Sequence, residues 1–98
     1  MRDFEKIARI VEDTATPVFG SVRILGVKAA LGHDADGDEI LRIKVLYDGI
    51  PDDVDIKGVS GLVRMLRPKL FALAGESAFP VISYISNAED GVEYFAAA

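Results

Sequence analysis

Residues 48–75 read DGIPDDVDIKGVSGLVRMLRPKLFALAG, a stretch in which acidic, basic and apolar residues are sorted in order. The acids come first and the bases follow: Asp48, Asp52, Asp53 and Asp55, then Lys57, Arg64, Arg67 and Lys69. Six apolar residues recur mostly at steps of three and four: Val59, Leu62, Val63, Leu66, Leu70 and Leu73. This spacing predicts a helix over about residues 55–74. The charge order suits its dipole, which places roughly half a positive charge at the N-terminus.

Two residues bear on how this helix runs and ends. Pro68 falls inside the pattern, where proline costs about 3 kcal/mol and clashes with the carbonyl four residues back. We therefore expect either a kink there or two short helices, with Pro68 in the first turn of the second. Gly75 is suited to the C-terminal cap.

The residues before this stretch predict a helix and a hairpin. Residues 3–14 show an amphipathic helical pattern with Asp3 as N-cap, and Pro17 is expected to prevent its continuation. Residues 19–31 predict a strand. Its apolar residues occupy even positions in the first half and odd positions in the second, which either a bulge near Leu25-Gly26 or burial on both faces would explain. A turn over residues 32–38, with Asp36-Gly37 suited to positive φ, joins it to a second strand over about 39–47.

After the long helix, residues 79–86 predict a third strand, with Pro80 favouring a strand end or an edge position. Residues 87–97 resemble a short helix that begins with a capping box. The order is therefore α-β-β-α-β-α in one domain spanning residues 1–98. We expect an α+β fold with a three-stranded mixed sheet in the order 2-1-3 and helices packed on one face, the strand after the crossover lying parallel to the second.

Composition limits the function classes. The chain has 98 residues, a net charge of −5, no cysteine and 50% hydrophobic residues. A core of this size buries only about two-thirds of the unfolded surface, so the apolar content predicts a homodimer or a stable protein partner. The negative charge makes a general nucleic-acid binder unlikely, and no apolar run is long enough for a membrane span, so a cytoplasmic location is the default. Disulfides and thiolate chemistry are excluded.

Three acidic residues alternate in Asp34-x-Asp36-x-Asp38, as in a calcium loop. Such a loop needs glycine at its sixth position and glutamate at its twelfth, where this chain has Glu39 and Val45. We therefore predict no metal, no cofactor and no catalytic residue. His33, the only histidine, fits a surface loop, although a small enzyme or ligand binder using His33 and the acidic loop remains a second alternative.

Gly58-Val59-Ser60-Gly61 resembles the G-x-x-G that K-homology domains use to clamp an RNA backbone. The resemblance covers four positions. It implies an alternative function, RNA binding through a glycine turn and a basic helix face, with Gly58, Gly61, Arg64 and Arg67 as the nucleic-acid-binding residues.

The leading hypothesis is a small non-catalytic protein-interaction module, either self-associating or bound to a partner encoded alongside it. The basic helix face would dock an acidic partner, since arginine suits bidentate carboxylate contacts. Aromatic residues near the C-terminus would either close over the core or anchor an interface. The predicted partner-binding residues are Lys57, Arg64, Arg67, Tyr94 and Phe95.

Overall fold

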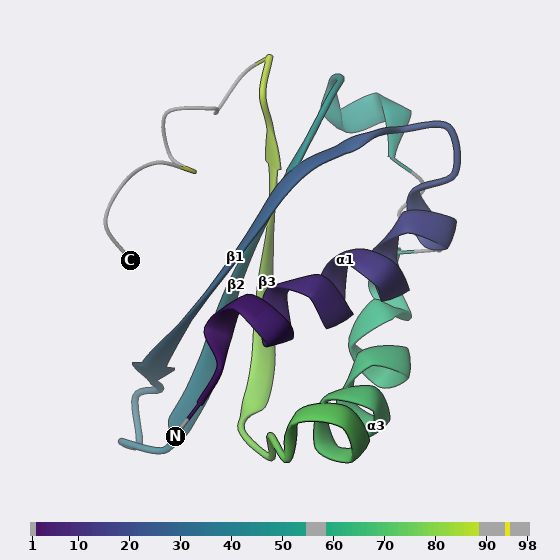
Figure 1. Ribbon diagram of the computed structural model, residues 1–98. Coiled ribbons are helices and arrows are strands. Elements are labelled where there is room, and N and C mark those ends of the chain that lie inside the picture. Colours follow the sequence, from purple (N-terminus) through teal and green to yellow (C-terminus); the bar gives the residue numbers. More distant parts are fainter. Residues whose placement is uncertain (1, 55–58, 89–93, 95–98) are drawn as a thin grey trace.

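The computed structural model describes residues 2–54, 59–88 and 94 of the 98 (Figure 1). In this part of the chain the elements are, in order, α1 (Phe4–Phe19), β1 (Ile24–His33), β2 (Glu39–Tyr47), a 3-10 turn η1 (Pro51–Asp53), α3 (Leu62–Ala74) and β3 (Phe79–Ser86). The α+β class is confirmed, and β2 and β3 have the predicted bounds. No helix of the described segments is long and apolar enough to cross a bilayer. The predicted helix over 87–97 lies almost entirely outside the described residues.

The three strands form a mixed sheet in the order β1-β2-β3, so the predicted order 2-1-3 is wrong. β1 pairs antiparallel with β2, and β3 pairs parallel with β2, both as expected. The hairpin occupies one side of β2, and the crossover through α3 brings β3 to its other side. β2 accordingly has buried residues on both faces, with Leu41 and Ile43 beneath the helices and Leu46 on the opposite face, where Arg42 is exposed.

β1 contains the predicted bulge. Its register with β2 shifts between Ile24 and Gly26, so Leu25 is the additional residue. The shift brings Ile24 and Val27, which lie on opposite sequence parities, against the same core. The strand begins at Ile24 rather than at residue 19, because Phe19 still belongs to α1.

α1 continues through Pro17, contrary to prediction, and ends with Gly20 at a φ of 61°. Proline inside a helix costs about 3 kcal/mol, whereas burying one phenylalanine side chain contributes about 1.5–3 kcal/mol. Phe19 is buried with its ring 5.9 Å from the rings of Tyr47 and Tyr84, and Val18 packs beside it. Burial of Phe19 and partial burial of Val18 offset the cost of Pro17, so tertiary packing extends the helix.

The break expected near Pro68 lies instead at Gly61. Val59 and Ser60 are helical, Gly61 is a turn, and α3 then runs from Leu62 to Ala74 with Pro68 inside it. Gly75 forms the expected C-terminal cap, with a φ of 63° and its N–H bonded to Leu70 and Phe71 carbonyls. Residues 55–58 of the predicted helix lie outside the described residues.

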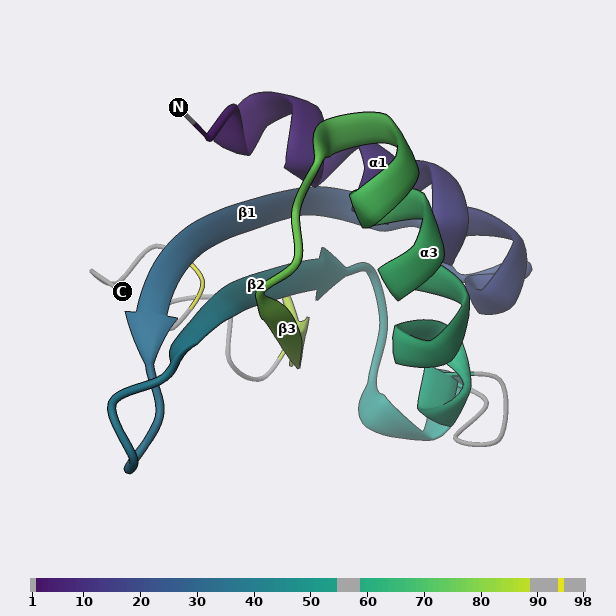
Figure 2. The same cartoon turned by 90° about the horizontal axis from the view of Figure 1, so that it is seen from below.

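Both helices lie on the same side of the sheet (Figure 2). The core between these layers is formed by Ile7, Ile10, Val11, Ala15, Phe19, Leu41, Ile43, Val45, Tyr47, Leu62, Leu66 and Leu70. On the opposite side Tyr94 covers Leu46 and Ile85 in a small separate cluster. The exposed outer face of α3 and the start of β3 border the site described next.

Candidate partner-binding groove

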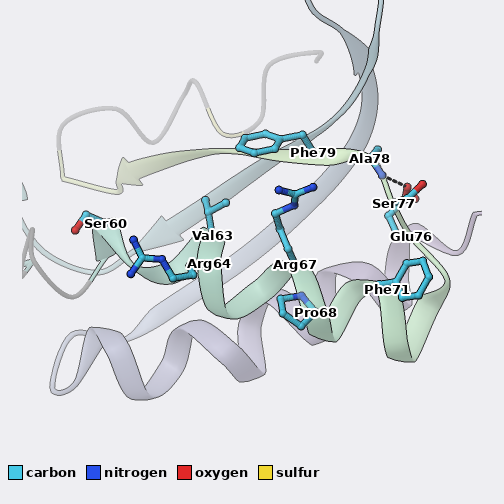
Figure 3. A pocket seen from close by; sticks show the side chains of 10 residues that line it. All are labelled: Ser60, Val63, Arg64, Arg67, Pro68, Phe71, Glu76, Ser77, Ala78 and Phe79. Carbon is cyan, nitrogen blue, oxygen red and sulfur yellow. Dashed lines mark hydrogen bonds between the residues drawn. The ribbon is translucent and has the colours of Figure 1, made fainter.

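An open groove of about 640 Å³ runs between α3 and the first residues of β3 (Figure 3). Its walls combine two arginines, two phenylalanines, one carboxylate and smaller residues. The lining residues are Ser60, Val63, Arg64, Arg67, Pro68, Phe71, Glu76, Ser77, Ala78 and Phe79. We call this the α3–β3 groove.

The burial pattern of α3 determines which side chains face the groove. Leu62, Leu66 and Leu70, one helical turn apart, are buried in the core and fix the rotation of the helix. That rotation leaves Arg64 and Arg67 exposed along the groove, as Figure 3 shows. The two predicted partner-binding arginines therefore belong to one site.

Aromatic rings border the arginines. The Arg67 guanidinium carbon lies 4.9 Å from the centroid of the Phe79 ring, which is a cation–π contact between helix and strand. Phe79 is 48% exposed, and Phe71 is 66% exposed. Phenylalanine and arginine are both enriched at protein interfaces relative to the rest of the protein surface.

The carboxylate of Glu76 is occupied within the chain. Arg2 donates from Nε to Oε1 at 2.7 Å, and the Ala78 N–H donates to Oε2 at 2.9 Å. Burial of Glu76 alone would raise its pKa, but these hydrogen bonds outweigh burial and hold the pKa below its ordinary value. Arg2 also contacts Glu39 at 2.9 Å, and the pKa of its guanidinium is raised, first by the hydrogen bond to Glu76 and then by Glu39.

The groove is consequently cationic at its surface although the whole chain is acidic. Within the described residues, neither Arg64 nor Arg67 forms an ion pair, whereas Glu76 is neutralised by Arg2. Among the described residues, no carboxylate thus neutralises these two guanidinium groups.

Tyr94, another predicted binding residue, lies on the opposite side of the sheet from the helices. It is buried against Leu46 and Ile85, and Lys28 Nζ lies 4.5 Å from the centroid of its ring. Burial, followed by the charge of Glu12, raises the pKa of its phenol. In this arrangement Tyr94 packs within its own chain and is remote from the groove lining.

Lys57, Gly58 and Phe95 lie outside the described residues, and Gly61 adjoins the groove as the residue before α3.

His33 ends β1 beside the hairpin turn, where Asp34 accepts hydrogen bonds from the backbone N–H groups of Asp36 and Asp38. Among the described residues no group of three or more acidic or histidine side chains could hold a metal ion.

Seven lining residues were not predicted as part of a site: Val63, Pro68, Phe71, Glu76, Ser77, Ala78 and Phe79. Arg2, which pairs with Glu76, was not predicted either. Phe71 carried a usable signal, because it lies outside the Leu62, Leu66 and Leu70 spacing of the helix. The contribution of Phe79 and the pairing of Arg2 with Glu76 depend on how distant segments fold together, so local sequence carried no signal for them.

Comparison of the chain with family models, curated proteins and solved structures finds no match. Among the described residues, the groove is therefore the feature that bears on function.

Proposed function

We propose that this protein is a small, non-catalytic interaction module that binds an acidic protein partner in the α3–β3 groove. The observation that carries the proposal is the pair Arg64 and Arg67, both without an ion pair in the described chain, beside the exposed rings of Phe71 and Phe79. Arginine and aromatic residues are enriched at interfaces, where the aromatic rings supply buried area and arginine supplies directional hydrogen bonds.

Charge distribution also supports a protein partner. The chain carries −5 overall, so it repels an acidic partner at long range, and recognition must be local to the groove, where salt screens the charge of the rest of the molecule. Arginine binds carboxylates in a bidentate geometry, which gives such local contacts direction as well as strength.

The test is capture from a native extract with tagged protein, followed by mass spectrometry. We expect wild-type protein to retain a partner that Arg64→Glu/Arg67→Glu loses. The matched control is Arg9→Glu/Lys69→Glu, which changes the net charge equally at exposed positions outside the groove. Equal capture by all three proteins, or no captured partner at all, would contradict the proposal.

A second candidate function, binding of single-stranded RNA, is favoured by one specific observation. Ser60 lines one end of the groove and Gly61 adjoins it, so half of the glycine tetrapeptide lies beside Arg64. Retention on single-stranded RNA should then decrease steeply as the salt concentration rises. Absence of retention at low salt would eliminate this candidate.

A further inference from the structure

β3 is an edge strand with little protection against pairing. Among the described strands only β2 pairs with it, and its first residue, Phe79, lines the α3–β3 groove. Edge strands usually carry charged side chains, prolines, bulges or covering segments that prevent another chain from adding to the sheet. The eight residues Phe79–Ser86 contain no charged side chain, and Pro80 is the one residue unable to donate a backbone hydrogen bond.

The other edge of the sheet is protected. β1 has a bulge at Leu25, which disrupts regular pairing, and it carries Lys28. Tyr94 lies over the bulge, since a Cβ added at Gly26 would come within 2.6 Å of its hydroxyl oxygen. Within the described residues, β1 is therefore a protected edge and β3 an unprotected one, and β3 begins at Phe79, which contacts Arg67.

We propose that the partner supplies an extended acidic segment that pairs with β3 as a fourth strand. Its backbone would hydrogen-bond to the outer side of β3, and its carboxylates would contact Arg64 and Arg67 from the same groove. Backbone pairing gives such complexes affinity, and pockets for alternate side chains give specificity. This inference rests on the proposed function and adds the conformation and sequence pattern of the bound segment.

Geometry predicts the pattern. Arg64 and Arg67 are separated by about 4.5 Å along the helix axis, and Arg67 and Phe71 by about 6 Å, at 1.5 Å per residue. Alternate residues of a strand point to one face and lie about 6.7 Å apart. The arginine side chains are flexible enough to compensate for the difference between the residue spacing of the helix and that of the strand. The bound segment should therefore present two acids at alternate positions and an apolar residue two positions further along, beside Phe71.

A second copy of this chain fits the groove poorly. Its own unprotected edge, β3, would bring no carboxylate to Arg64 or Arg67, and the nearby Glu76 is already held by Arg2. A nucleic acid would supply anions but cannot form the backbone ladder of a sheet. An acidic polypeptide can both hydrogen-bond to the edge of β3 and bring carboxylates to Arg64 and Arg67.

The experiment measures binding of a fluorescent eight-residue peptide to the full chain by anisotropy. The peptide has two glutamates at alternate positions and a leucine two positions further along, in either chain direction. The comparison peptides are one of the same composition with adjacent glutamates and two N-methylated on alternate residues, one for each parity. N-methylation removes backbone N–H donors from the peptide and leaves its charge unchanged. This comparison therefore needs no variant of the protein.

We expect one N-methylated peptide to lose about tenfold or more in affinity and the other to bind like the parent, since only alternate N–H groups face a neighbouring strand. The adjacent-glutamate peptide should bind more weakly. Arg64→Glu/Arg67→Glu should lose binding, whereas Arg9→Glu/Lys69→Glu should retain it.

Three results would overturn the inference. In the first, neither N-methylated peptide differs from the parent. In the second, a single-stranded oligonucleotide binds in the same arginine-dependent way and displaces the peptide. In the third, the protein has twice its mass of 10.6 kDa and excludes every peptide. If the capture experiment succeeds while N-methylation has no effect, the interaction function stands and only the strand-pairing inference fails.

Discussion

Replacement of Glu76 by glutamine should destabilise the protein by about 2 kcal/mol at pH 7, because a hydrogen bond to a charged group contributes about 1.5–3 kcal/mol. The side chain of Glu76 is 4% exposed and receives hydrogen bonds from Arg2 and from the Ala78 N–H. Glutamine has the same shape as glutamate but no charge. Its amide group would also direct N–H donors toward the donors of Arg2 or Ala78. For a domain of this size the loss corresponds to a decrease in Tm of about 8–16 °C.

The effect should depend on pH. The folded-state pKa of Glu76 lies below its ordinary value of 4.5, so the ionised carboxylate stabilises the folded state above that pH. This contribution is lost as the pH falls through the folded-state pKa, where the carboxyl becomes protonated in both states. The stability difference between wild type and Glu76→Gln should therefore shrink progressively below pH 4.5.

Urea unfolding followed by circular dichroism at pH 7 and pH 3 measures both effects. Glu39→Gln is the matched control, since Glu39 contacts the same guanidinium of Arg2 at 2.9 Å but its side chain is 51% exposed. An exposed ion pair contributes about 0–1 kcal/mol, so the control should lose little. The reasoning is refuted if both variants have the same urea midpoint, or if the loss in Glu76→Gln is as large at pH 3 as at pH 7.

Three further substitutions test the fold. Pro17→Ala should stabilise the protein by about 1–2 kcal/mol in urea unfolding, because alanine restores a helical N–H donor, and this gain exceeds the cost of a more flexible unfolded chain. A lower stability of the variant would show that the proline ring itself is needed. Leu66→Ala should cost about 2–5 kcal/mol, enough to leave much of the chain unfolded by circular dichroism at 37 °C; a cost below 1 kcal/mol would contradict its central burial. Gly26→Ala should destabilise wild type but be nearly neutral in a Tyr94→Ala background, because its Cβ would meet the Tyr94 hydroxyl; equal costs in the two backgrounds would contradict that contact.

Local sequence signals predicted most of the elements of this protein. β2 and β3 have the expected bounds because alternation and flanking turn residues mark strands directly. The bulge in β1 was detectable because its apolar residues change parity at Leu25-Gly26. The end of α1 was not predictable, since the local effect of Pro17 opposes burial of Phe19, which depends on Tyr47 and Tyr84 from two strands.

Strand order and the groove were harder to predict for the same reason. The abundance of apolar residues in β1 suggested a central position, but the crossover brings β3 to the open side of β2. Arg64 and Arg67 stood out because their charge breaks the pattern of an otherwise acidic chain. Phe79 joins them only when β3 returns beside α3, a contact that no local pattern encodes.

The Arg2–Glu76 pair joins residues 74 positions apart in the chain. It can form only after both α1 and the α3–β3 turn have reached their final positions, so it is expected to be absent from the rate-limiting state of folding. Removing such a late contact accelerates unfolding and leaves the refolding rate almost unchanged. We therefore expect the pair to slow the unfolding of the native protein without changing the rate at which it folds.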